Sequence, residues 1–152
     1  MKIKHLSALL VSGLLLLACS TPRIPVAGTP QMDTQAKTFA VHPARARIYV
    51  YRNLSSLSEE LRVNGAVVGT LTGRSYLPLE VSPGTYRLQA KRERETILEL
   101  NVLAGRNYFV LLEAIESPMN YRSSLREASE AEAREAIKSS QLLLSPVYPL
   151  TP

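Results

Sequence analysis

The sequence has one cysteine and two histidines in 152 residues, and it has no tryptophan. A single cysteine excludes an intramolecular disulfide, and the lack of clustered Cys and His argues against a zinc or iron site. His42 follows a long stretch without hydrophobic periodicity, where a catalytic triad would not be held in place. No Gly-rich phosphate loop and no nucleophile-elbow motif is present. We therefore expect no cofactor and no enzymatic activity.

The chain also has only a small excess of positive over negative charge. The formal net charge is +5, and it falls to +3 without residues 1–18, which hold two lysines and no acid. This charge is too small and too evenly mixed with acids to predict nucleic-acid binding. Glu93, Glu95 and Glu99 could supply the paired carboxylates of a glycoside hydrolase. Arginines lie between them at an expected hairpin tip, so a solvated surface is the better interpretation and a hydrolase is the least favoured hypothesis.

The only long apolar run lies at the N-terminus. Leu6 to Ala18 carries no charge and follows Lys2 and Lys4. A transmembrane helix needs roughly 20 apolar residues, and this run is shorter. A positive start, a short apolar stretch and a small residue before the end are typical of an export signal.

The run ends in Leu16, Leu17, Ala18 and Cys19, which resemble the lipobox of bacterial lipoproteins. We expect cleavage after Ala18 and transfer of a diacylglyceryl group to the Cys19 thiol, with palmitate among the acyl chains that Cys19 carries. Several chains on one residue would hold the protein stably, because one acyl chain alone binds a membrane only marginally. Ser20, where an aspartate would favour retention, implies an outer-membrane lipoprotein facing the periplasm. The alternatives are an ordinary cleaved signal with a chance cysteine, or an uncleaved membrane anchor.

The composition divides the chain into four parts: a signal peptide at 1–18, a Pro-rich tether at 19–43, a β-sandwich domain at 44–127, and a helix with a Pro-rich tail at 128–152. The tether has four prolines and little periodicity, which predicts an extended or disordered segment that lifts the domain clear of the membrane.

Short runs of Val, Ile, Tyr and Leu, separated by turn residues, predict strands in the third part. The expected strands are Arg45–Arg52, Glu60–Asn64, Ala66–Leu71, Tyr76–Val81, Thr85–Lys91, Thr96–Val102 and Tyr108–Ile115, with Tyr121–Leu125 as a candidate last strand. Asn64-Gly65 predicts a type I′ hairpin turn. Because Tyr108–Ile115 is apolar on both faces, we place it centrally. These features predict a mainly β fold, an antiparallel immunoglobulin-like or PEGA-like sandwich of about six or seven strands, plus one C-terminal helix.

The C-terminal helix is expected over about residues 128–143. Ser124 with Glu127 and Ser129 with Glu132 both have capping-box spacing. Its apolar stripe would consist of Ala133, Ala136, Ile137 and Leu144.

Several motifs follow one another in a recognisable order. They are Ile48–Arg52, Val63–Gly69, Tyr76, Val81–Gly84 and Ala104–Val110. In this order behind a lipobox, the region from about Ala46 to Leu125 resembles a widespread family of bacterial lipoproteins with a small β-sandwich domain of unknown function. The hairpin and the Pro-Gly turn also resemble PEGA-type repeats of bacterial surface proteins. The resemblance implies a fold and an envelope location, but no activity and no catalytic residues.

Tyrosine is the enriched aromatic residue, with seven Tyr against two Phe. A tyrosine-lined face could stack on a glycan or bind a peptide, and Tyr49, Tyr51 and Arg52 are the first choice for such a face. The alternative, which we favour, is that the strand tyrosines sit at sandwich edges with their hydroxyls in water, since they do not all share one strand parity.

Three functions remain after these exclusions. The leading hypothesis is a non-enzymatic accessory lipoprotein of the cell envelope that contacts a partner protein through its sandwich surface or an edge strand. The second is a peptidoglycan- or glycan-binding module, and the third is a hydrolase. The expected partners are the membrane, through Cys19, and an envelope protein or peptidoglycan, but no nucleic acid.

Overall fold

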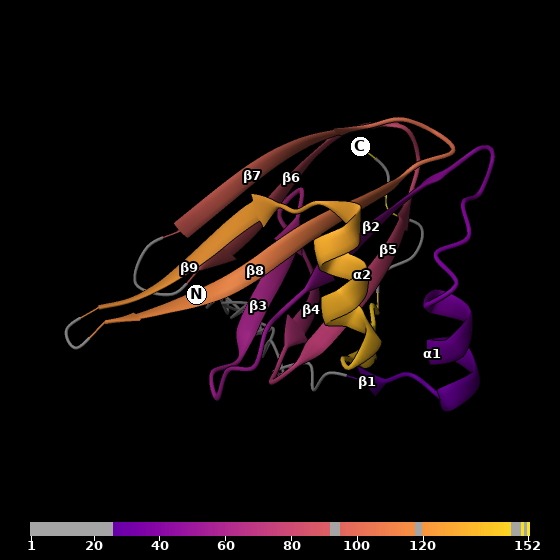
Figure 1. Ribbon diagram of the computed structural model, residues 1–152. Coiled ribbons are helices and arrows are strands. Elements are labelled where there is room, and N and C mark those ends of the chain that lie inside the picture. Colours follow the sequence, from indigo (N-terminus) through magenta and orange to yellow (C-terminus); the bar gives the residue numbers. More distant parts are fainter. Residues whose placement is uncertain (1–25, 92–94, 118–119, 147–149, 151) are drawn as a thin grey trace, which may run out of the picture.

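The computed structural model describes residues 26–91, 95–117, 120–146, 150 and 152 (Figure 1). The predicted signal peptide, the lipobox with Cys19, and Glu93 at the expected hairpin tip lie outside the described residues.

The described chain forms two packed β-sheets. The six-stranded sheet contains, in spatial order, β1 (Val26–Ala27), β10 (Gln141–Leu144), β5 (Ser75–Val81), β2 (Ala46–Tyr51), β8 (Asn107–Ser117) and β9 (Asn120–Glu127). The four-stranded sheet contains β4 (Ala66–Leu71), β3 (Glu59–Val63), β6 (Gly84–Lys91) and β7 (Glu95–Val102). The predicted mainly β sandwich is confirmed, and each expected strand is present within two residues of its predicted ends.

The larger sheet is mixed, so the expectation of a purely antiparallel sandwich is wrong. β2 pairs with β8 in parallel, and β5 pairs with β10 in parallel. Parallel neighbours need a long crossover connection. Here the strands of the second sheet provide the crossover between β2 and β8. The described residues contain ten strands and two helices, against about six or seven strands and one helix expected from the sequence.

The tight turns form where the sequence predicts them. Asn64 and Gly65 have φ angles of 49° and 82° between β3 and β4, as a type I′ turn requires. The Asn64 side chain also accepts a hydrogen bond from the Arg87 backbone amide at 2.9 Å. Strand β8 lies between β2 and β9, which confirms its central position.

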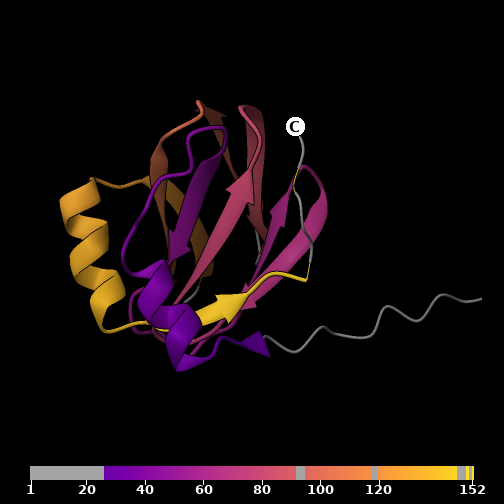
Figure 2. The same cartoon turned by 90° about the vertical axis from the view of Figure 1, so that its right-hand side faces the viewer.

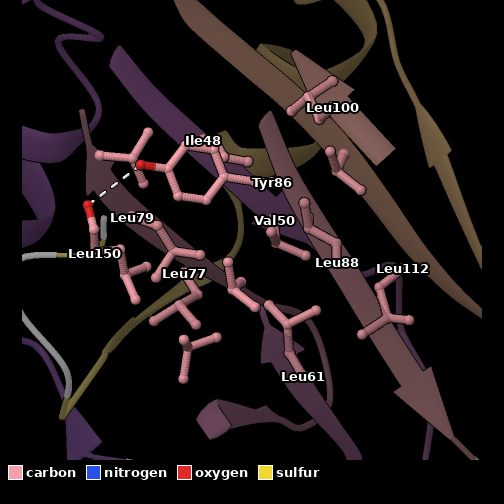
Figure 3. Close-up of a cluster of buried hydrophobic side chains, with 14 of the residues drawn as sticks. Ile48, Val50, Leu61, Leu77, Leu79, Tyr86, Leu88, Leu100, Leu112 and Leu150 are labelled. Carbon is pink, nitrogen blue, oxygen red and sulfur yellow. Dashed lines mark hydrogen bonds between the residues drawn. The ribbon is translucent and has the colours of Figure 1, made fainter. Parts of the chain in front are cut away.

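The main core fills the space between the sheets (Figure 3). Ile48 and Leu79 from the larger sheet and Leu61 and Leu88 from the smaller sheet are all fully buried. The phenol of Tyr86 lies in this core and donates hydrogen bonds to two backbone carbonyls, one of them that of Leu150 at 3.3 Å. This hydrogen bond fixes the C-terminal tail to the core at Leu150.

A second core covers the outer face of the larger sheet. Helices α1 (Pro30–Ala36) and α2 (Glu130–Lys138) both lie over this face (Figures 1 and 2). The buried members are Phe39, Tyr49, Tyr51, Tyr76, Phe109, Leu111, Ala133, Ile137 and Leu142. The larger sheet is therefore apolar on both sides.

The segment predicted as a tether, 19–43, is structured from Val26 onward, so that prediction is wrong over most of its length. Val26 and Ala27 pair with β10. Thr29 caps α1 by accepting a hydrogen bond from the Met32 amide at 3.3 Å, with Pro30 in the first turn. A Thr cap followed by Pro suits a helix start, and packing on the sheet supplies the stability that a seven-residue helix lacks alone.

The C-terminal helix is shorter than expected. It begins after the Ser129 cap, as predicted, but ends at Lys138. Leu144 lies in β10 and not on the helix stripe. In this strand Leu142 and Leu144 face the second core and Leu143 faces the main core, which is the alternation of a β-strand. Ser124 and Glu127 form no capping box, since both belong to β9.

Candidate functional site

The predicted binding face of Tyr49, Tyr51 and Arg52 is wrong. Their relative exposures are 0, 1 and 1%. The two helices cover Tyr49 and Tyr51, and Arg52 is buried against the backbone near the end of β4, so no ligand outside the protein can stack on them. The alternative, hydroxyls in water at sandwich edges, is also wrong for the tyrosines of this face.

The buried tyrosines hold the helices on the sheet. Tyr49 donates a hydrogen bond to the Ala36 carbonyl at 3.0 Å, and Tyr76 donates to the Asp33 carboxylate at 2.7 Å. Both acceptors belong to α1. Tyr51 contacts Glu132 of α2 at 3.4 Å.

The environment keeps the phenols of Tyr51 and Tyr76 neutral. Burial is the main cause that raises the pKa of Tyr51 to about 12, and the nearby Glu132 carboxylate adds to it. Burial, followed by the hydrogen bond to Asp33, raises the pKa of Tyr76 well above its usual range. Both groups therefore act as hydrogen-bond donors throughout the physiological range.

Arg52 has a structural role. Its Nη1 donates hydrogen bonds to the carbonyls of Leu57 at 2.6 Å and Leu71 at 2.8 Å. These bonds attach the serine-rich loop 53–58 to the end of β4. The predicted role of Arg52 in a binding face is replaced by this buried contact.

A groove remains between α1 and the sheet, and we name it the α1 groove. Its volume is about 450 Å³, within the range of ligand pockets. Its lining residues are Gln31, Met32, Gln35, Ala36, Arg47, Pro78, Glu80, Leu142 and Leu144. Aliphatic side chains and Pro78 dominate this lining.

Two arginines share one carboxylate at the α1 groove. Arg47 contacts Glu80 at 3.3 Å, and Arg45 contacts the same carboxylate at 3.6 Å. Partial burial acts to lower the pKa of Arg47, but hydrogen bonds to Tyr49 and Glu80 outweigh it and raise the pKa. Arg47 also donates to the Ala40 carbonyl at 3.3 Å. The groove therefore presents an apolar surface beside a paired charge, which suits an uncharged apolar ligand.

A second surface lies on the hairpin of β8 and β9, which extends away from α1 (Figure 1). Leu54 and Ile115 line a hollow of about 210 Å³ there, and they are 75 and 51% exposed. Tyr121, 47% exposed, lies on the neighbouring strand. The register pairs Ile115 with Arg122 and Tyr121 with Glu116, so Ile115 and Tyr121 lie on opposite faces of the hairpin. We name the exposed apolar and aromatic residues of both faces, Leu54, Ile115 and Tyr121, the hairpin surface. At its base, buried Ser123 donates a hydrogen bond to buried Glu59 at 2.9 Å, which fixes β9 against β3.

Sequence reasoning missed the residues of both surfaces. Gln31, Met32 and Gln35 lie in the segment predicted as a tether, although Thr29-Pro30 is a recognisable helix start. Leu54 lies in the loop between the first two predicted strands, for which the sequence indicated no function, and Tyr121 was placed on a candidate strand without a function.

The described residues offer neither a metal site nor a membrane-spanning helix. No group of three His, Cys, Asp or Glu side chains among them could hold a metal ion. No helix in the part of the chain that the structure describes is long and apolar enough to cross a membrane.

Comparison with known proteins identifies the domain but not its role. A search of curated proteins finds no match. A family model described as a protein of unknown function, DUF2846, matches residues 42–124. This range nearly coincides with the region from Ala46 to Leu125 that the sequence motifs indicated. The resemblance to PEGA-type repeats is not confirmed by this match. Because the match spans more than half of the chain, the protein belongs to the DUF2846 family.

Proposed function

We propose that the protein is a lipid-anchored component of the bacterial cell envelope that acts without catalysis, by contact with a partner protein. The observation that carries the anchor is the uncharged run that ends in Ala18 and the sole cysteine, Cys19. An export signal that ends in this way suits lipid attachment better than a redox or metal role for a lone thiol. Ser20 favours the outer membrane, with the domain in the periplasm.

The hairpin surface supports the contact with a partner protein. Leu54, Ile115 and Tyr121 are large apolar or aromatic side chains that remain exposed on a domain with two well-filled cores. Exposed apolar groups of this kind, beside an edge strand such as β9, are typical of protein–protein contacts.

Glycan binding is the weaker candidate. It depended on tyrosines that stack on sugars, and Tyr49, Tyr51, Tyr76 and Tyr86 are all buried. Among the tyrosines that the structure describes, Tyr121 is the exposed one that could still serve this purpose. Sedimentation with purified peptidoglycan, compared for wild type and Tyr121→Ala, separates the two functions. Pelleting of the wild type and loss of pelleting in the variant would favour the glycan function.

The anchor is tested by metabolic labelling with palmitate. Cys19→Ala removes the acceptor thiol, so we expect labelled wild type and unlabelled variant. Cys19→Ser is a matched control for side-chain size, and it too should remain unlabelled. Equal labelling of variant and wild type would refute the anchor.

The partner contact is tested by crosslinking in cells. A photoreactive residue at Tyr121 should trap a discrete protein, whereas one at Asn101, exposed on β7 of the other sheet, should not. An identical adduct pattern from both positions would contradict a contact at the hairpin surface.

A further inference from the structure

Few residues separate the proposed anchor, Cys19, from the folded domain. Val26 pairs with Leu144 of β10, so the chain is already held in the sheet seven residues after Cys19. Seven residues span at most about 25 Å when fully extended. A tether that continued to the first predicted strand at Arg45 would have reached about 90 Å. If Cys19 carries the lipid, as proposed above, the domain cannot stand clear of the bilayer.

This limit restricts the orientation of the domain. A compact unit of the size of residues 26–152 has a radius of gyration of about 14 Å and therefore a diameter of about 35 Å. A chain of about 25 Å cannot pass around such a body. Val26 therefore cannot lie on the side away from the membrane. The remaining orientations place β1, and α1 next to it, at or near the bilayer.

The surface at this end is suited to lipid. Val26 is 59% and Met32 is 45% exposed, and both are apolar. Met32 and Leu144, the partner of Val26, line the α1 groove. Exposed apolar side chains of this kind are stabilised by burial at the boundary between headgroups and acyl chains. The exposed polar residues of α1, Gln31, Thr34 and Gln35, suit the headgroup layer.

Nearby charges do not oppose this contact. Lys37 forms an ion pair with Asp33 at 2.7 Å and also donates to the Ser140 carbonyl at 3.0 Å. Arg47 pairs with Glu80 at 3.3 Å within the groove, and Arg45 contacts the same carboxylate at 3.6 Å. One positive charge is therefore in excess, and anionic lipid headgroups attract positive charge. Paired charges cost less to bring toward a lipid surface than isolated ones.

We propose that the end of the domain formed by β1 and α1 rests on the bilayer that holds Cys19. Val26 and Met32 contact the phospholipid, and the α1 groove opens toward the acyl chains. The β8–β9 hairpin extends from the side away from α1 (Figures 1 and 2), so the hairpin surface remains free to meet a partner.

The absence of tryptophan makes a direct test possible, because a single introduced tryptophan reports one position. Met32→Trp and Ile97→Trp replace residues of similar exposure, 45 and 41%, and Ile97 lies on β7 of the other sheet. Each full-length, lipidated variant is reconstituted into phosphatidylethanolamine and phosphatidylglycerol vesicles with brominated acyl chains. Bromine quenches fluorescence only at short range. We expect quenching in Met32→Trp to be at least about threefold that in Ile97→Trp, since an interfacial residue reaches the acyl boundary.

Val26→Trp serves as a second reporter in case the first variant disturbs α1, and it should be quenched like Met32→Trp. Equal, weak quenching of all three variants would overturn the proposed contact. Flotation of wild type and Cys19→Ala with the vesicles separates this result from failure of the anchor. If the wild type floats without differential quenching, the anchor stands and the contact is wrong. If the wild type carries no palmitate and does not float, the anchor is wrong and the contact falls with it.

Discussion

Removal of one hydroxyl group, by Tyr76→Phe, tests whether the buried tyrosines hold α1 on the sheet. The Tyr76 hydroxyl donates to Asp33 at 2.7 Å, and its ring is fully buried beneath the helix. A hydrogen bond to a charged group contributes about 1.5–3 kcal/mol. Asp33 keeps its ion pair with Lys37, and its side chain is 29% exposed, so it is not left without a partner. We therefore expect a loss at the lower end of this range, about 1.5 kcal/mol.

Urea unfolding measures this loss, and hydrogen exchange locates it. The free energy of unfolding should fall by about 1.5 kcal/mol, and the amides of 30–36 should exchange faster while those of β6 change less. Tyr121→Phe removes an exposed hydroxyl and is the matched control, with a change within about 0.5 kcal/mol. If Tyr76→Phe behaves like this control by both measurements, the tyrosine does not hold α1 and the reasoning is refuted.

Three further predictions follow from the same packing. The folded state raises the pKa of Tyr51 to about 12, whereas an unfolded tyrosine titrates near about 10. The contribution of Tyr51 to stability is therefore complete below a pH of about 10 and is lost as the pH rises toward about 12. An alkaline titration in which Tyr51→Phe removes no late-titrating phenol would contradict this. Gly28→Ala should cost about 1–3 kcal/mol, because its Cβ would lie 2.4 Å from the Leu142 side chain. The double variant with Leu142→Ala should show favourable coupling of about 1 kcal/mol, measured by urea unfolding, and strict additivity would count against the clash. Arg52→Met should cost at least about 2 kcal/mol in the same assay, because the buried Leu71 carbonyl and the partly buried Leu57 carbonyl lose their donor. A residue of a solvent-facing binding surface would change stability little.

The proposals together describe a domain with two functional ends. The end with β1 and α1 would face the bilayer, and the hairpin surface would face the periplasm. Their experiments are independent, because the lipid contact is measured at Met32 and the partner contact at Tyr121. Failure of one does not decide the other.

The strands and turns could be predicted from the sequence because their signals are local. Thr85–Lys91 alternates apolar and polar side chains with period two, and Asn64-Gly65 accepts the positive φ angles of a type I′ turn. The apolar character of β8 on both faces predicted an interior strand, and it lies between β2 and β9. The Ser129 cap likewise marked the start of α2.

Only the tertiary structure decided what covers the outer face of the larger sheet. The run Ile48-Tyr49-Val50-Tyr51 is apolar at every position, which indicates two covered faces, but it does not show which segments cover them. The Pro-rich stretch before Val41 and the C-terminal helix do so, through hydrogen bonds and ring contacts that join residues far apart in sequence.

The sequence by itself determined the elements of the β domain, the type of its hairpin turn and the motif that ends at Cys19. The parallel pairing of β5 with β10, the burial of Tyr49 and Tyr51, and the position of α1 were decided by the tertiary structure. The physical reason is that a short helix or strand gains its stability from the surface on which it packs. That surface exists only once both sheets have formed, so the short distance from Cys19 to the folded domain could not be read from the order of residues alone.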